Sequence, residues 1–88
     1  MKIGFGLVTC QRNPGDPEGR DHAALYRQAI ELAKEVEAVG LDSYWVSEHH
    51  FWDDGHLPSL MPLLAAVATV TERIELATGV LLAPLHGD

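Results

Sequence analysis

The sequence predicts an α/β fold in which parallel strands alternate with helices. Apolar stretches with strand character occur at residues 3–8, 42–47 and 74–82, and a helical pattern separates each from the next. Strands that alternate with helices form right-handed crossovers and a parallel sheet. The 88 residues therefore predict a βαβαβ order within one small domain or part of a larger one.

The first expected strand carries glycine at two positions of one face, Gly4 and Gly6. We expect the opposite face to carry the apolar side chains of Ile3, Phe5 and Leu7. Because glycine weakens a strand, two glycines on one face indicate that a layer of side chains, a helix or a ligand approaches closely there. Tight packing inside a sheet or barrel is the more common of these outcomes.

Helical periodicity is clearest between Asp21, which fits an N-cap, and Gly40, which fits the left-handed residue after a helix. The apolar stripe expected on this helix consists of Leu25, Ala29, Leu32, Ala33 and Val36. Residues 60–70 are apolar nearly all round, so we expect the second helix to be largely buried. Residues 9–20 form a polar loop, whose Arg12 and Arg20 either hold an anion or, more commonly, are solvated.

Titratable side chains follow the second strand directly, at Glu48, His49 and His50. Parallel α/β folds usually place their chemistry at the carboxyl ends of the strands. A histidine titrates near neutral pH and can give or take a proton, so His49 is the candidate catalytic residue. The alternative is a structural histidine at a strand end. Adjacent side chains diverge on a strand, so we expect His50 to be structural and Glu48 to orient a histidine.

A metal site is the rival interpretation of the same loop. The loop also carries the ligand-type side chains Asp53, Asp54 and His56. Adjacent histidines diverge, however, and the sequence has neither an H-x-x-x-H nor a C-x-x-C spacing. We therefore predict no metal. Cys10, at the end of the first strand, is expected either to line a substrate pocket or, more commonly, to act as a small buried hydrophobe.

Composition narrows the possible partners. The formal net charge is -7, which disfavours nucleic acid and anionic membranes. The longest apolar stretch, residues 60–70, is too short to span a bilayer. A single cysteine cannot form an internal disulfide, which suits a reducing compartment. We expect a soluble, cytoplasmic protein.

Three segments give the sequence a family resemblance. They are Ile3-Gly4-Phe5, the run from Gly40 to Phe51, and residues 71–80 followed by Pro84-Leu85-His86. The most specific pieces are Glu-His-His-Phe after the second strand and Ala-Thr-Gly-Val in the third. Together they resemble the amino-terminal part of the bacterial luciferase-like monooxygenases. The resemblance covers essentially the whole chain and implies that residues 1–88 are the first βαβαβ segment of a TIM, or (β/α)8, barrel domain.

The resemblance also implies a cofactor and roles for individual residues. Family members use reduced FMN or, in a sister branch, F420. The F420 branch often has Ser/Thr-Asp-His at residues 47–49, where this chain has Ser-Glu-His, which favours FMN. His49 would lie beside the flavin ring as an acid/base residue, with Glu48 behind it. The residues that the resemblance places along the flavin are Thr78, Gly79 and Val80, and the Gly79–Val80 bond would be the non-prolyl cis peptide that family members often have.

Three strands and two helices are too few to close a barrel, which leaves strand edges and one apolar face uncovered. We expect either a segment of a longer chain, which we favour, or a piece that oligomerises. The expected function is a flavin-dependent monooxygenase that oxidises a small organic substrate, assembles as a homo-oligomer and receives reduced FMN from a flavin reductase. The alternatives are a non-catalytic half-barrel that self-associates and an F420-dependent oxidoreductase.

Overall fold

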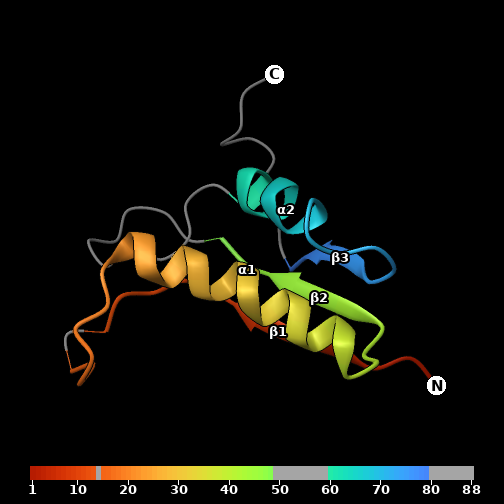
Figure 1. Cartoon of the computed structure of the whole chain (residues 1–88), viewed down its shortest axis with the longest axis horizontal. Coiled ribbons are helices and arrows are strands. Elements are labelled where there is room, and N and C mark those ends of the chain that lie inside the picture. The colour runs from red at the N-terminus through yellow and green to blue at the C-terminus, as the bar shows by residue number, and fades with distance from the viewer. Residues whose placement is uncertain (14, 49–59, 80–88) are drawn as a thin grey trace.

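The computed structural model describes residues 1–13, 15–48 and 60–79. Its elements are β1 (Gly4–Val8), α1 (His22–Ala38), β2 (Ser43–Val46), α2 (Leu60–Ala68) and β3 (Glu75–Thr78). The strands form one parallel sheet with β2 in the centre, and both helices lie on the same side of it (Figure 1). The predicted βαβαβ order is confirmed for this part of the chain. No helix among the described residues is long and apolar enough to cross a membrane.

The core lies between the helices and one face of the sheet. Tyr44 and Val46 of β2 are fully buried there, and the ring of Phe5 stacks on Tyr44 with the centroids 6.2 Å apart. The Tyr44 hydroxyl donates a hydrogen bond of 2.7 Å to the carbonyl of Ala29, which joins the strand to α1. The buried helix residues are Ala29, Ala33 and Val36 of α1 and Leu60, Leu63, Leu64 and Val67 of α2. The predicted stripe on α1 is therefore the face that packs on the sheet.

Within the described residues, no helix covers the opposite face of the sheet. Trp45 lies on this face, because it alternates with the buried side chains of β2, and it is 39% exposed. Trp45 lies close to three glycines. A Cβ built at Gly4 would lie 2.8 Å from Trp45 Nε1, and one built at Gly6 would lie 2.7 Å from Trp45 Cβ. A Cβ built at Gly79 would lie 3.3 Å from Trp45 Cε3. The close approach predicted at Gly4 and Gly6 is thus made by a side chain of the neighbouring strand.

The prediction that Leu7 shares the face of Phe5 is wrong. Phe5 pairs with Tyr44 and Val8 pairs with Val46, so β1 advances three residues while β2 advances two. This irregularity reverses the alternation of side chains. Val8 therefore packs against the core, whereas Leu7 lies on the open face and is 56% exposed.

A cis peptide bond joins Gly6 and Leu7 in this part of β1. The family resemblance led us to expect a cis bond between Gly79 and Val80 instead. Val80 lies outside the described residues, so that expectation stays a prediction.

Both predicted ends of α1 are confirmed. The Asp21 carboxylate caps the helix by accepting a hydrogen bond of 2.8 Å from the Ala24 N–H. At the other end, Gly40 adopts a φ of 94°. The N–H groups of Gly40 and Leu41 donate to the carbonyls of Glu37 and Val36, respectively. This pattern is a Schellman motif, in which glycine is favoured because the φ is positive.

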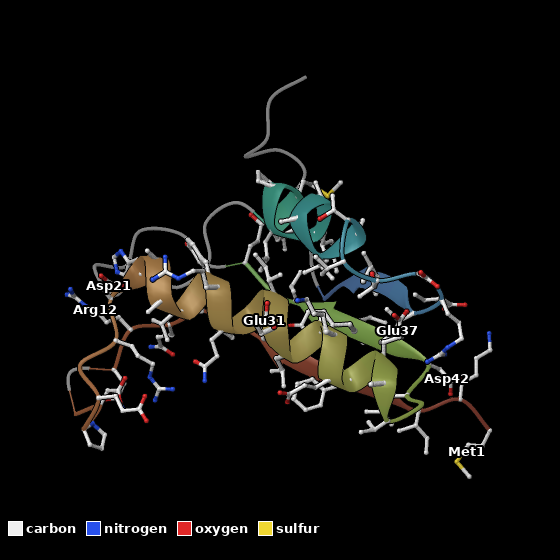
Figure 2. The ribbon with its side chains drawn as sticks, viewed as in Figure 1. Met1, Arg12, Asp21, Glu31, Glu37 and Asp42 are labelled. Carbon is white, nitrogen blue, oxygen red and sulfur yellow. The ribbon has the colours of Figure 1, made fainter. Side chains whose placement is uncertain are left out.

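Glu37 ties the end of α1 to the turn that enters β3. Its carboxylate accepts backbone hydrogen bonds from the N–H groups of Arg73 at 2.7 Å, Ile74 at 2.9 Å and Glu72 at 3.0 Å. These hydrogen bonds, with that from Arg73 the strongest contributor, lower the pKa of the Glu37 carboxyl. Figure 2 shows Glu37 near the end of the molecule where Met1 and Asp42 lie, away from Arg12 and Asp21.

We expect Glu37→Gln to lower the melting temperature at neutral pH. We also expect the melting temperature of this variant to fall less steeply as the pH is lowered. The carboxyl pKa is depressed in the folded state, so the interaction stabilises the fold above the pKa of the unfolded chain and is lost as the pH falls through the folded-state pKa. Thermal unfolding from neutral to strongly acidic pH measures this. Glu35→Gln, on an exposed position of the same helix, is the control. An identical pH profile for both variants would contradict the assignment.

Candidate functional site

Hydrogen bonds between the strands bring three strand ends to one edge of the sheet. The N–H of Ser47 donates to the carbonyl of Val8 at 3.2 Å, and the N–H of Gly79 donates to the carbonyl of Val46 at 2.8 Å. Because the strands are parallel, all of them end at this edge, which we call the rim. The residues of the rim are Thr9 and Cys10 after β1, Ser47 and Glu48 after β2, and Gly79 after β3. The sequence predicted this meeting of strand ends, and the structure confirms it for these residues.

Glu48 is a buried carboxylate of the rim. It is only 5% exposed, and the neighbouring Ser47 is buried as well. A carboxylate is seldom buried unless hydrogen bonds or opposite charges stabilise it. A carboxylate held inside the fold can accept a hydrogen bond from an imidazole N–H and so fix the orientation of the ring.

Several predicted site residues lie outside the described residues. They include His49 and His50, which follow Glu48, and Val80, which follows Gly79. Their predicted roles stay predictions. The same holds for the loop residues Asp53, Asp54 and His56. Within residues 1–13, 15–48 and 60–79, no cluster of three or more His, Cys, Asp or Glu side chains is arranged to hold a metal ion.

Cys10 lies on the helix side of the rim, away from the open face. It lines a cavity of about 180 Å3 between β1 and α1, together with Val8, Leu25 and Ala29. The side chain is only 7% exposed, and burial raises the pKa of its thiol to about 11. The thiol is therefore protonated at neutral pH and a poor nucleophile. Cys10 belongs to the buried core, as the more common of the two predicted outcomes describes, while also lining the cavity.

Arg20 is engaged within the loop that follows β1. Its guanidinium binds the Asp16 carboxylate with two hydrogen bonds, of 2.7 and 3.1 Å, and donates a third, of 3.2 Å, to Gln28 on α1. The side-chain hydrogen bond from Arg20 is the main reason that the pKa of the Asp16 carboxyl lies well below its usual range. Arg20 is thus a structural residue of the loop, paired with a carboxylate of the same chain.

Trp45 is the residue near the rim that the sequence analysis missed. The alternation of β2 placed Trp45 opposite Tyr44, and the glycines of β1 signalled a close approach, but no pattern connected the two. Gly79 completes the arrangement: a Cβ there would lie 3.1 Å from Leu7 Cδ2 and 3.3 Å from Trp45 Cε3. The packing of Leu7 and Trp45 therefore requires glycine, or a shift of these side chains, at position 79.

The rim residues fit a flat aromatic cofactor. Gly79 presents backbone without a side chain, and the indole of Trp45 and the side chain of Leu7 supply exposed apolar surface beside it. Thr78 and Glu48 stand at the same strand ends, but Thr78 pairs with Val46, whose side chain faces the core, so the Thr78 side chain lies on the helix side of the sheet. Apolar walls with a few placed polar groups are typical of cofactor sites.

Comparison with known proteins identifies the family. The sequence profile of the luciferase-like monooxygenases matches residues 1–87. The chain belongs to this family. The fold class predicted from the sequence, a parallel βαβαβ segment of a (β/α)8 barrel, agrees with the two solved relatives described below.

The similar proteins include a monooxygenase and a dehydrogenase. The chain is 34% identical over 85 residues to 4-hydroxyprotoasukamycin monooxygenase of Streptomyces nodosus subsp. asukaensis, covering 97% of the chain and 22% of the relative. It is 43% identical over 89 residues to an F420-dependent glucose-6-phosphate dehydrogenase of Kineococcus radiotolerans, covering 98% of the chain and 23% of the relative.

Two solved structures share the arrangement of the strands and helices. One is a monooxygenase from Streptomyces bottropensis, with a TM-score of 0.76 and 27% identity, covering 92% of this chain and 24% of that one. The other is the oxygenating constituent of 3,6-diketocamphane monooxygenase from Pseudomonas putida, solved in complex with FMN, with a TM-score of 0.74 and 29% identity, covering 96% of this chain and 22% of that one. The chain spans less than a quarter of the length of each of these four proteins.

Proposed function

We propose that the protein carrying these residues is a flavin-dependent monooxygenase that uses reduced FMN and O2 to oxidise a small organic substrate. The observation that carries the proposal is the buried carboxylate of Glu48, placed directly before His49 and at the same rim as Gly79. In a chain of the luciferase-like monooxygenases, this is the arrangement expected of a proton-handling histidine, its orienting carboxylate and a cofactor seat.

Each residue of the proposed site has one task. The reduced flavin, when bound, supplies the redox chemistry, and the protein supplies orientation and a dry pocket. Gly79 and Val80 line the ring system. His49 gives or takes a proton beside it. Glu48 orients a histidine of the site, by accepting a hydrogen bond from an imidazole N–H or by holding the backbone that carries it.

An F420-dependent oxidoreductase is the second candidate. The relative from Kineococcus radiotolerans, named as F420-dependent, shares 43% identity over 98% of the chain. FMN is favoured by the Ser47-Glu48-His49 triplet and by the FMN complex of the Pseudomonas putida relative. Both candidates place a tricyclic ring at the same rim.

Cofactor titration of the full-length protein tests the proposal. We expect reduced FMN to bind and to support substrate-dependent oxygen consumption, whereas F420 should do neither. Binding of F420 in place of FMN would establish the second candidate. A discrete oligomer that binds neither cofactor would overturn the proposal in favour of the non-catalytic alternative.

The proposed function implies partners that the same preparation can test. A monooxygenase that consumes reduced FMN needs a source of it, so we propose a flavin reductase as the functional partner and a homo-oligomer in the cytoplasm as the working form. Oxygen consumption should depend on added reductase and NAD(P)H when only oxidised FMN is supplied. Light scattering gives the oligomeric state.

A further inference from the structure

We propose that Trp45 forms the floor of the flavin pocket and determines how deeply the ring system sits at the mouth of the barrel. Trp45 would be a positioning residue that touches the cofactor from the barrel side. The inference rests on the proposed function, because it needs a flavin or deazaflavin at the rim.

The position of the helices shows which side of the sheet Trp45 occupies. The helices cover the face of β2 that carries Tyr44 and Val46, so Trp45 lies on the other face. In a (β/α)8 barrel the helices form the outer ring, and the face without helices lines the interior. Trp45 is therefore an interior side chain of the barrel.

The three strands contribute side chains of very unequal size to this face. Barrel interiors are normally filled by layers to which several strands contribute bulky side chains. On this face β1 contributes Gly4, Gly6 and Leu7, and β3 and its end contribute Glu75, Ala77 and Gly79, so that four of these six residues are glycine or alanine. The indole of Trp45 fills the space that these small residues leave.

The indole of Trp45 is held at both of its ends. Its Nε1–H donates a hydrogen bond of 2.8 Å to Ser43 Oγ, near the start of the strands. Its benzene edge reaches the end of β3, where Cε3 lies 3.3 Å from the position of a Gly79 Cβ. The ring thus runs obliquely across the sheet and ends beneath the rim.

These positions determine what a ligand on Gly79 would meet. On the barrel side of Gly79 lie the benzene edge of Trp45 and the side chain of Leu7, both apolar and partly exposed. The polar residues Ser47 and Glu48 follow β2, at the rim itself. A planar aromatic ring fits this surface, because it can pack on an aromatic edge without losing hydrogen bonds.

Fluorine NMR of the full-length protein labelled with 5-fluorotryptophan tests the floor directly. The label replaces the hydrogen on Cζ3, the Trp45 atom that lies 3.8 Å from the position of a Gly79 Cβ. Trp45→Phe identifies the resonance of Trp45, and Ser43→Ala, which keeps the indole and removes its hydrogen-bond acceptor, identifies it if the first variant does not fold. We expect this resonance to shift in step with the absorbance change of FMN during titration.

Binding measurements give an independent readout. Loss of the indole edge in Trp45→Phe should weaken FMN binding by about two- to tenfold, whereas Trp52→Phe, the matched control at the other tryptophan of the sequence, should change it less. If FMN binds without shifting the Trp45 resonance, and Trp45→Phe binds FMN as tightly as the unmodified protein, then Trp45 does not contact the flavin. The proposed function would still stand. If neither FMN nor F420 binds, both are overturned.

Discussion

Replacing His49 with glutamine is expected to lower kcat/KM by about a hundredfold or more in the full-length protein, the range typical of a lost general acid or base. Glutamine keeps a hydrogen-bonding side chain of similar reach but cannot exchange a proton near neutral pH. Histidine and glutamine are also similar in size, so the exchange changes the capacity for proton transfer more than it changes the packing. The loss should therefore come from proton transfer rather than from folding. Steady-state kinetics with reduced FMN and a saturating reductase measure it.

His50→Gln is the matched control for this variant. It makes the same chemical change one residue later, at a side chain expected to diverge from that of His49. We expect it to retain most of the activity and the limb of the pH–rate profile that His49→Gln loses. Equal losses in the two variants would contradict the assignment of proton transfer to His49.

Gly6→Ala is expected to destabilise the fold by about 1–3 kcal/mol, the usual cost of forcing an extra group into a packed site. The new Cβ would lie 2.7 Å from Trp45 Cβ and 3.0 Å from the Trp45 carbonyl oxygen. Neither atom can move away by rotation of a side chain, because both are fixed by the backbone of β2. The strands themselves would have to separate. Urea unfolding followed by circular dichroism measures the loss.

Gly15→Ala provides the comparison for Gly6→Ala. Gly15 lies in the exposed loop after β1, where an added Cβ would come no closer than 3.4 Å to another atom, Asn13 Oδ1. Surface changes of this kind usually alter stability by no more than about 0.5 kcal/mol. Similar unfolding midpoints for the two variants would show that β1 and β2 do not pack as closely as described.

The order of elements and the limits of α1 were predictable because local signals encode them. The spacing of apolar residues on α1, the carboxylate of Asp21 and the glycine at position 40 each act within a few residues of the chain. Leu7 was placed on the wrong face for the opposite reason. Its orientation depends on the register between β1 and β2, which arises from pairing between distant segments and leaves no periodic trace in β1.

The candidate site was predictable to the same extent. Parallel strands end at a common edge, so the sequence sufficed to bring Glu48 and Gly79 to the rim. The burial of Glu48 was not predictable, because it depends on packing around the strand end. Trp45 was missed because its neighbours come from three strands. Gly4, Ser43 and Gly79 are among them, and only the register between the strands shows that these residues meet around the indole.

The hydrogen bonds of Glu37 lie at the end of the sheet remote from the rim. Glu37 thus joins α1 to the start of β3 at the end of the sheet that is remote from the proposed site. Loops at the rim can then change in length or sequence without disturbing the hydrogen bonds of Glu37. This separation allows substrate preference to change while the structure at the other end of the sheet is kept.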